Sequence, residues 1–141
     1  MVDLEADEER IKRVAAKYSR YGSKANQAMK TALAGGVKEH RFMPSRRTIH
    51  TVVGSQGDEF IDPEKSYCSC SHFFFRVFGG KDQTCYHLLS HKMATELGLV
   101  DVVTFDDSEY GQVFATLVDD VFSVIERSSG RPSVALDRKK L

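Results

Sequence analysis

The chain has 141 residues, 41% of them hydrophobic and 28% charged, which is typical of one globular domain and excludes a wholly disordered chain. Its apolar stretches run only a few residues, which argues against a transmembrane helix. The acidic N-terminus lacks the apolar segment of a secretory signal. We therefore expect a protein of the cytoplasm, or of the nucleus in a eukaryote, that is neither secreted nor bound to a membrane.

The net charge of zero conceals an uneven distribution. Residues 10–47 hold eleven Lys or Arg and one acid, whereas residues 99–126 hold seven acids and no Lys or Arg. A basic block of this kind indicates an anionic partner. The alternative is that the two blocks face each other within the fold.

Residues 4–34 are predicted to form one long helix, because apolar side chains gather on one face at helical spacing. The opposite face is basic and carries Arg10, Arg13, Lys17, Arg20 and Lys24. Gly35 and Gly36 follow as a helix stop. Gly22 lies on the apolar side, where it marks a kink, a break, or close packing against a neighbour.

The middle of the chain is predicted to be mostly β-structure. Strands are expected over residues 37–42, 47–53 and 59–61, where β-branched residues are frequent, and further ones over 66–70 and 72–78. Residues 86–97 then show helical spacing, and Gly98 is expected to end that helix.

The C-terminal part is predicted to form a strand over 99–105 and a helix over 107–127. Asp106 and Glu109 have the spacing of a capping box. The helix has a broad apolar stripe of Val113, Phe114, Leu117, Val121, Phe122 and Ile125. We expect part of this stripe to pack on the N-terminal helix and part to form a homodimer interface. Residues 128–141 are expected to be a flexible tail.

All three cysteines lie in one pattern, in which Cys68-Ser69-Cys70 is followed after fourteen residues by Cys85-Tyr86-His87. Three thiolates and one imidazole make a complete tetrahedral ligand set for a structural Zn²⁺, and no cysteine is left over. His72 and His91 compete as ligands by their position in the sequence. We prefer His87, because it falls in the first turn of the helix that follows Cys85.

The order of these residues, CxC…CxH, resembles the SWIM zinc finger over residues 37–97. The pattern is similar to that of small archaeal SWIM proteins and of the SWIM subunit of the Shu recombination complex. The resemblance implies a β-hairpin-plus-helix module with one Zn²⁺ and a role in DNA recombination or repair. We therefore predict a single α+β domain over residues 1–127. It has a small antiparallel β-hairpin region between the long N-terminal helix and the amphipathic C-terminal helix.

Four protein ligands leave the zinc no open position for water or substrate, so we expect no enzymatic activity. The predicted function is binding of nucleic acid, specifically DNA. Its predicted contacts are Arg13, Lys17, Arg20, Lys24, Arg46 and Arg47. The alternative is a protein-interaction adaptor that pairs with a recombinase-family ATPase or another partner without touching DNA.

The aromatic segment His72–Phe78 has two interpretations. As a strand, one of its faces could stack on bases. We prefer the alternative that both faces are buried, because aromatic side chains dominate small cores.

Overall fold

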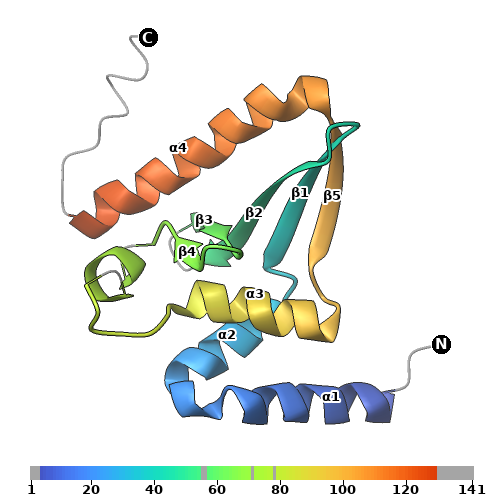
Figure 1. Cartoon of the computed structure of the whole chain (residues 1–141), viewed down its shortest axis with the longest axis vertical. Helices are drawn as coiled ribbons and strands as arrows, with labels where there is room; N and C mark the ends of the chain where they lie inside the picture. Colours follow the sequence, from blue (N-terminus) through green and yellow to red (C-terminus); the bar gives the residue numbers. More distant parts are fainter. Residues whose placement is uncertain (1–3, 55–56, 71, 78, 130–141) are drawn as a thin grey trace.

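The computed structural model describes residues 4–54, 57–70, 72–77 and 79–129; the side chains of residues 4–6 and 120–129 lie outside that description. Helices and strands alternate irregularly along the chain (Figure 1). In order they are α1 (Leu4–Lys17), η1 (Ser19–Tyr21), α2 (Ser23–Leu33), β1 (Val37–Met43), β2 (Arg47–Gly54), β3 (Gly57–Asp62), β4 (Tyr67–Cys68), η2 (Phe73–Val77), α3 (Tyr86–Leu97), β5 (Asp101–Asp106), η3 (Asp107–Glu109) and α4 (Tyr110–Ser129). The α+β class is as predicted.

The five strands form one mixed sheet in the order β4-β3-β2-β1-β5. Four strands are antiparallel neighbours, but β5 pairs parallel to β1 at the far edge, with Lys38 opposite Asp101. The sheet is therefore larger than the predicted hairpin region. A parallel neighbour requires a long crossover, and the chain makes it through α3.

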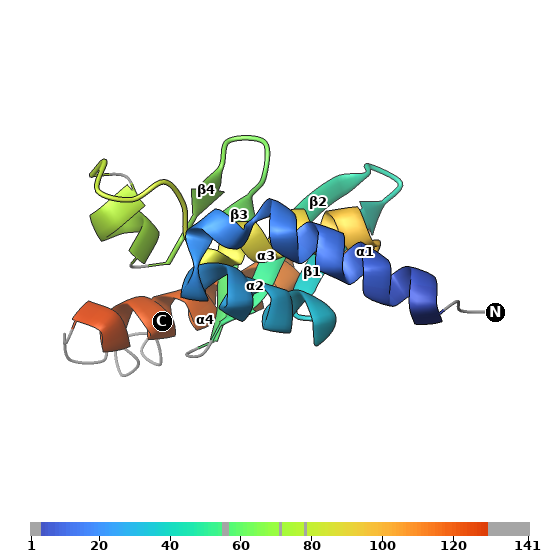
Figure 2. The ribbon, with the colours of Figure 1, turned by 90° about the horizontal axis from the view of Figure 1, so that it is seen from below.

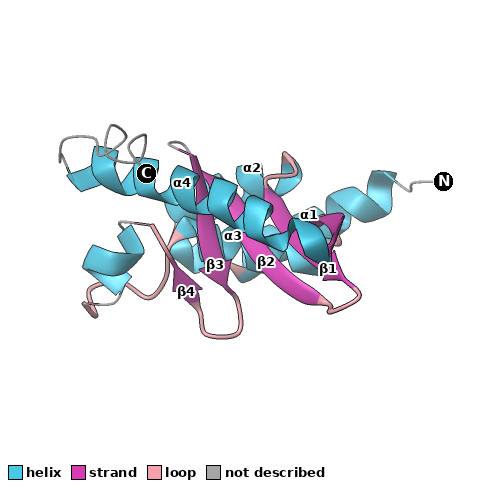
Figure 3. Ribbon diagram, turned by 90° about the horizontal axis from the view of Figure 1, so that it is seen from above, coloured by secondary structure: helices cyan, strands magenta, loops and turns pink. Residues whose placement is uncertain are grey.

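Helices cover both faces of the sheet. Helix α3 lies directly against one face, and α2 and α1 pack behind it, whereas α4 crosses the opposite face over β3 (Figures 1 to 3). None of the described helices is both long and apolar enough to cross a membrane.

Side chains that alternate between the two faces of the sheet form two separate hydrophobic cores. On the α3 face, Val37 pairs with Val52, and Ile61 pairs with Cys68; these four are buried with Leu89 and Met93 of α3. On the opposite face, Phe42 and Ile49 are buried beneath Leu117 of α4. Residues on opposite faces of a strand alternate, so β1, β2 and β3 each contribute to both cores.

The predicted N-terminal helix is interrupted. Helix α1 ends at Lys17, and α2 starts only at Ser23. Gly22 lies between them with φ of 62° and ψ of −131°, a backbone conformation that interrupts a helix and that glycine adopts at little cost. Of the three alternatives for Gly22, the structure shows the break. The stop after α2 is as predicted, with Gly35 at φ 76°.

The predicted docking of the C-terminal helix is wrong. The capping box is confirmed: Asp106 accepts from the Ser108 amide and Glu109 accepts from the Asp106 amide. Helix α4, however, packs on the sheet, and α1 and α2 lie beyond the other face (Figure 1). The reason is that Phe42, Ile49 and Phe60 offer α4 an apolar surface of their own.

The apolar stripe of α4 is described over its first two turns. Val113 is half-buried and Leu117 buried, while Phe114 is exposed. The side chains of Val121, Phe122 and Ile125 lie outside the described residues, so the homodimer interface stays a prediction. Ser128 and Ser129 belong to α4, and the rest of the predicted tail, residues 130–141, lies outside the described residues.

Candidate metal centre

The first pair of cysteines is held by β3. Cys68 ends the short strand β4, paired with Ile61. Ser69, between the two cysteines, donates its amide to the Phe60 carbonyl at 3.0 Å, and its hydroxyl accepts from the Phe60 amide at 3.0 Å. The Phe73 amide lies 3.3 Å from Cys70 Sγ. Backbone bonds on both sides therefore fix the direction of both thiols.

The second pair of ligands stands at the start of α3. Cys85 is the N-cap residue, with extended backbone, and His87 lies in the first helical turn, as the sequence predicts. A helix N-terminus stabilises negative charge, so this is a favourable position for a thiolate.

The structure brings the four residues together. One ligand atom each from Cys68, Cys70, Cys85 and His87 lies within 4.8 Å of the others, and all four side chains are buried. Tetrahedral zinc with Zn–S bonds of about 2.3 Å sets its sulfur ligands about 3.8 Å apart, so small side-chain shifts suffice. The three cysteines are free thiols, and both ring nitrogens of His87 are buried without a hydrogen-bond partner. A bound cation would satisfy one of these nitrogens, so the residues fit a metal.

The three buried thiols cannot all ionise by themselves. Hydrogen bonds with Cys70 and Cys85, together with burial, raise the pKa of Cys68 above its ordinary value. Hydrogen bonds from Cys68 and Cys70 lower the pKa of Cys85. Because a divalent cation must displace the remaining protons, metal affinity rises with pH.

The two competing histidines lie elsewhere. The exposed His72 places its Nε2 3.0 Å from Asp82 Oδ2. His91 packs against His50 with ring centroids 5.5 Å apart. Neither belongs to the cluster of ligand atoms found among the described residues.

The six cationic residues predicted to contact nucleic acid lie in two places. Helices α1, η1 and α2 carry the first group, which consists of Arg13, Lys17, Arg20 and Lys24. The second group, Arg46 and Arg47, lies at the β1–β2 turn, at the opposite end of the molecule (Figure 1). The break at Gly22 also divides the helical line of the first four. The structure therefore does not assemble the six into one surface.

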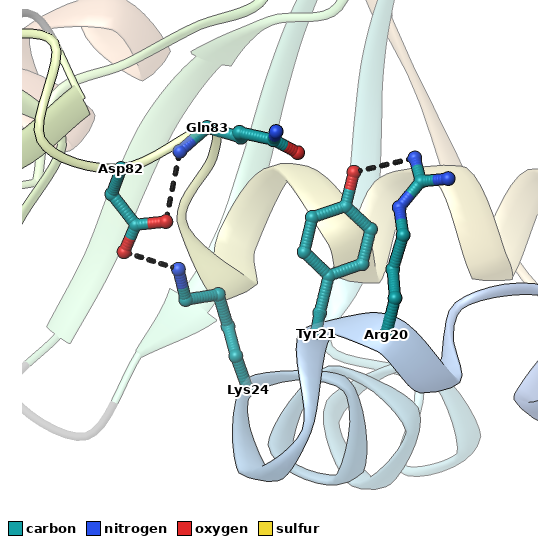
Figure 4. Close-up of a pocket in the computed structure, with 5 residues that line it drawn as sticks. All are labelled: Arg20, Tyr21, Lys24, Asp82 and Gln83. Carbon is teal, nitrogen blue, oxygen red and sulfur yellow. Dashed lines mark hydrogen bonds and ion pairs between the residues drawn. The ribbon is translucent and has the colours of Figure 1, made fainter.

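Several of these cations are engaged within the chain. Lys17 forms an ion pair with Glu96 of α3. Lys24 Nζ lies 2.6 Å from Asp82 Oδ2 and donates to the Thr84 carbonyl. Arg20 donates to the Tyr21 hydroxyl. Arg20, Tyr21, Lys24 and Asp82 line one pocket together with Gln83 (Figure 4).

At the other end of the molecule, the Arg47 guanidinium stacks 4.0 Å from the Tyr110 ring centroid and lies 3.9 Å from Asp107. The ion pair between Arg47 and Asp107 joins the basic and acidic blocks of the sequence. Arg13 and Arg46 are exposed.

The aromatic segment differs from both expectations for it. Residues 73–77 form one helical turn, η2, rather than a strand. Phe73 is partly buried against the core, but Phe74 and Phe75 are 65% and 63% exposed, so the predicted burial of both faces is wrong. Phe78 lies outside the described residues. The physical reason is position: beyond the edge strand β4 the chain must turn back toward α3 (Figures 1 and 2).

Sequence reasoning missed Glu59 of β3, which is buried beside the cluster. Its carboxylate accepts from the Ser69 hydroxyl at 2.7 Å, and burial raises its pKa. The available signal was strand alternation, since Glu59 shares a face with the apolar Ile61.

A buried Cys₃His set in CxC…CxH order, held between an edge strand and a helix N-terminus, defines a zinc-finger type of metal module in an α+β fold and suggests zinc binding. The chain is 36% identical over 76 residues to a Dictyostelium discoideum protein named Zinc finger SWIM domain-containing protein 7 homolog. The aligned stretch covers 52% of this chain and 49% of that relative, so about half of each protein is compared. No protein-family model and no solved structure matches the chain. The motif and the similarity together support a SWIM-domain protein.

Proposed function

We propose that this chain is a non-enzymatic SWIM zinc-finger protein that binds single-stranded nucleic acid, in particular DNA during recombination or repair. The observation that carries the proposal is the exposure of Phe74 and Phe75 on η2, between the two ligand pairs. The process is the one that the resemblance to SWIM proteins implies.

Two large aromatic rings exposed to water are costly unless a ligand covers them. The Phe74 and Phe75 rings lie 5.2 Å apart at 89° to each other. Rings at this angle cannot share one base, but each can receive one of two splayed bases. The neighbouring Arg76 and Lys81 are exposed and supply positive charge. Exposed aromatic rings beside cations are typical of single-strand binders, whereas bases in a duplex have no free faces.

In this proposal the chain holds one Zn²⁺ with a structural role. Four protein ligands close its coordination shell, which leaves no position for a reacting water. The metal would fasten Cys70 and Cys85 together. Because these residues bound the segment that carries Phe74 and Phe75, the zinc would fix where the rings are presented.

The test is titration of labelled single-stranded and duplex DNA with the zinc-loaded protein at several salt concentrations. Stacking of one base on one aromatic ring contributes about 1–3 kcal/mol. Phe74→Ala and Phe75→Ala should therefore each weaken single-strand binding by about 5- to 150-fold. Arg76→Gln should flatten the logarithmic salt dependence by about 0.7 if it contacts one phosphate.

The matched control is Phe114→Ala, which removes a phenylalanine that is 44% exposed on α4, away from the metal. It should bind single strands as the wild type does. The proposal would be overturned if the wild type did not bind at low salt, or if the double variant Phe74→Ala/Phe75→Ala bound as well as the wild type.

The adaptor alternative is favoured by a different observation. Strand β5 is an edge of the sheet, and Leu99, Val102 and Val103 beside it or within it are exposed. An exposed apolar edge strand can pair with a strand of another protein. A stoichiometric partner that is retained after nuclease treatment and lost on Val102→Lys would support an adaptor that acts without DNA.

A further inference from the structure

We propose that Lys24 of α2 and Asp82, which follows η2, form a clasp that fixes the direction in which the turn η2 presents its aromatic rings. Both would then be positioning residues for nucleic-acid binding, and Lys24 would support that binding without touching a phosphate. The effect on binding rests on the proposed function. The clasp itself is made by contacts between side chains that are not metal ligands.

The contact between Lys24 and Asp82 joins two segments that are far apart in the sequence. Lys24 Nζ lies 2.6 Å from Asp82 Oδ2 and donates to the Thr84 carbonyl at 2.8 Å. Figure 4 shows the Lys24 side chain reaching from α2 to the carboxylate. The two side chains are only 20% and 27% exposed, so solvent screens this ion pair less than an exposed one. The segment that follows η2 is therefore attached to α2 at two points.

Asp82 also connects the two ends of η2. At the start of the turn, His72 Nε2 lies 3.0 Å from Asp82 Oδ2. At its end, the Arg76 carbonyl accepts from the amides of Lys81 at 2.8 Å and of Asp82 at 3.0 Å. One residue thus joins the entry and the exit of the turn, and its ion pair with α2 joins the closed turn to the helical layer.

The rings of Phe74 and Phe75 depend on the backbone of this turn for their direction. They are 65% and 63% exposed, so packing against the core does little to hold them. The Phe74 amide donates to the Cys70 carbonyl at 3.2 Å, which fixes the start of the turn from the first ligand pair. The clasp supplies the attachment at the far end. Without it, a bound strand would have to order the turn, and ordering one flexible side chain lowers affinity about 3- to 10-fold.

The sign of the effect at Asp82 separates positioning from simple electrostatics. Nucleic acid is a polyanion, so removal of a nearby carboxylate that only repels it should strengthen binding. Removal of a carboxylate that positions the rings should weaken binding. Lys24 gives the matching distinction. Loss of a phosphate contact flattens the logarithmic salt dependence by about 0.7 on single strands, whereas loss of a positioning contact leaves that slope unchanged.

The experiment titrates labelled single-stranded DNA with the zinc-loaded wild type, Lys24→Met, Asp82→Ala and the double variant at several salt concentrations. We expect each single variant to bind about 3- to 10-fold more weakly with an unchanged salt slope. The double variant should lose no more than the weaker single variant, because both changes remove the same contact. The matched controls are Lys30→Met and Asp101→Ala, which make the same changes at exposed positions of α2 and β5. They should bind as the wild type does.

Amide ¹⁵N relaxation of the free, zinc-loaded proteins tests the clasp without DNA. The amides of Phe73–Val77 should become more mobile on the picosecond-to-nanosecond timescale in Lys24→Met and in Asp82→Ala. The amides of α3 should keep their wild-type values. Zinc content measured in parallel should equal that of the wild type, because no proposed ligand is changed.

Tighter DNA binding by Asp82→Ala, or a flatter salt slope in Lys24→Met, would overturn the proposal. So would a turn that stays as ordered in both variants as in the wild type. Loss of zinc in either variant would also overturn it, since the contact would then support the metal centre rather than the turn. If the wild type does not bind DNA, the proposed function fails, and increased motion of the turn in both variants would still support the clasp.

Discussion

Gly54, the last residue of β2, should be required for metal affinity. A Cβ atom at this position would lie 2.9 Å from the Gly57 carbonyl oxygen and 2.9 Å from His87 Nε2. The Gly57 oxygen belongs to backbone that pairs with Gly54 in the β2–β3 ladder, so it has little freedom to move. The His87 ring must therefore yield if Gly54 is replaced by alanine.

The size of the effect follows from these distances. Ordinary van der Waals contact starts at 3.4 Å, so the ring must move by 3.4 − 2.9 = 0.5 Å. Zinc–ligand distances tolerate only about 0.2 Å. We expect Gly54→Ala to weaken zinc binding by about 10- to 100-fold, the range found when the support of a ligand is lost. That range equals about 1.4–2.7 kcal/mol.

The assay is chelator competition monitored together with circular dichroism. Gly36→Ala is the matched control, because its Cβ would also lie 2.9 Å from a side-chain atom, Thr31 Cγ2, and no ligand atom is among its nearest neighbours. It should lower stability by about 1–3 kcal/mol through overpacking and leave zinc affinity unchanged. Wild-type affinity in Gly54→Ala, or an equal loss in Gly36→Ala, would refute the reasoning.

Four further predictions concern stability, pH and the metal itself. Leu117→Ala should cost about 2–5 kcal/mol in urea unfolding, because Leu117 is buried against Phe42 and Ile49; a loss below about 1 kcal/mol would contradict that packing. Gly111→Ala should raise the free energy of unfolding by about 0.5–1 kcal/mol, since the position is exposed in α4 with open space around it. Burial and the neighbouring His50 lower the pKa of His91, so its contribution to stability is complete above its unfolded value of 6.5 and is lost as the pH falls below it. Unfolding at pH 7.5 and pH 5.5 should therefore show a smaller acid loss for His91→Gln than for wild type, and equal losses would show that His91 is not involved. Cys68→Ser should reduce zinc content, by elemental analysis, and abolish the protection of β4 and the start of α3 from hydrogen exchange; full zinc retention would remove Cys68 from the ligand set.

The sequence alone was informative wherever the determining contacts are local. The spacing of Cys68, Cys70, Cys85 and His87 predicts a ligand set because the two residues of each pair are separated by a single residue in the chain. The capping box at Asp106 and the helix stop at Gly98 likewise depend on backbone groups within a turn of the residue. The helical spacing of residues 86–97 predicts a helix, and the bounds of α3 match it.

Long-range contacts decided the rest. The parallel pairing of β5 with β1 joins residues more than sixty positions apart, and no local pattern encodes which edge a strand will take. The same holds for Lys17, whose partner Glu96 lies on another helix, and whose charge is therefore not simply available to a ligand.

Exposure and burial were likewise decided by the tertiary structure. Phe74 and Phe75 are exposed because the chain leaves the sheet at its edge strand, although their hydrophobic side chains favour a buried position. Glu59 is buried because its strand position faces α3, although its charge indicates a surface. Hydrophobicity gives a side chain's preference, but the free energy is decided by the neighbours that the fold supplies. For Glu59 the compensating neighbour is Ser69, ten residues away.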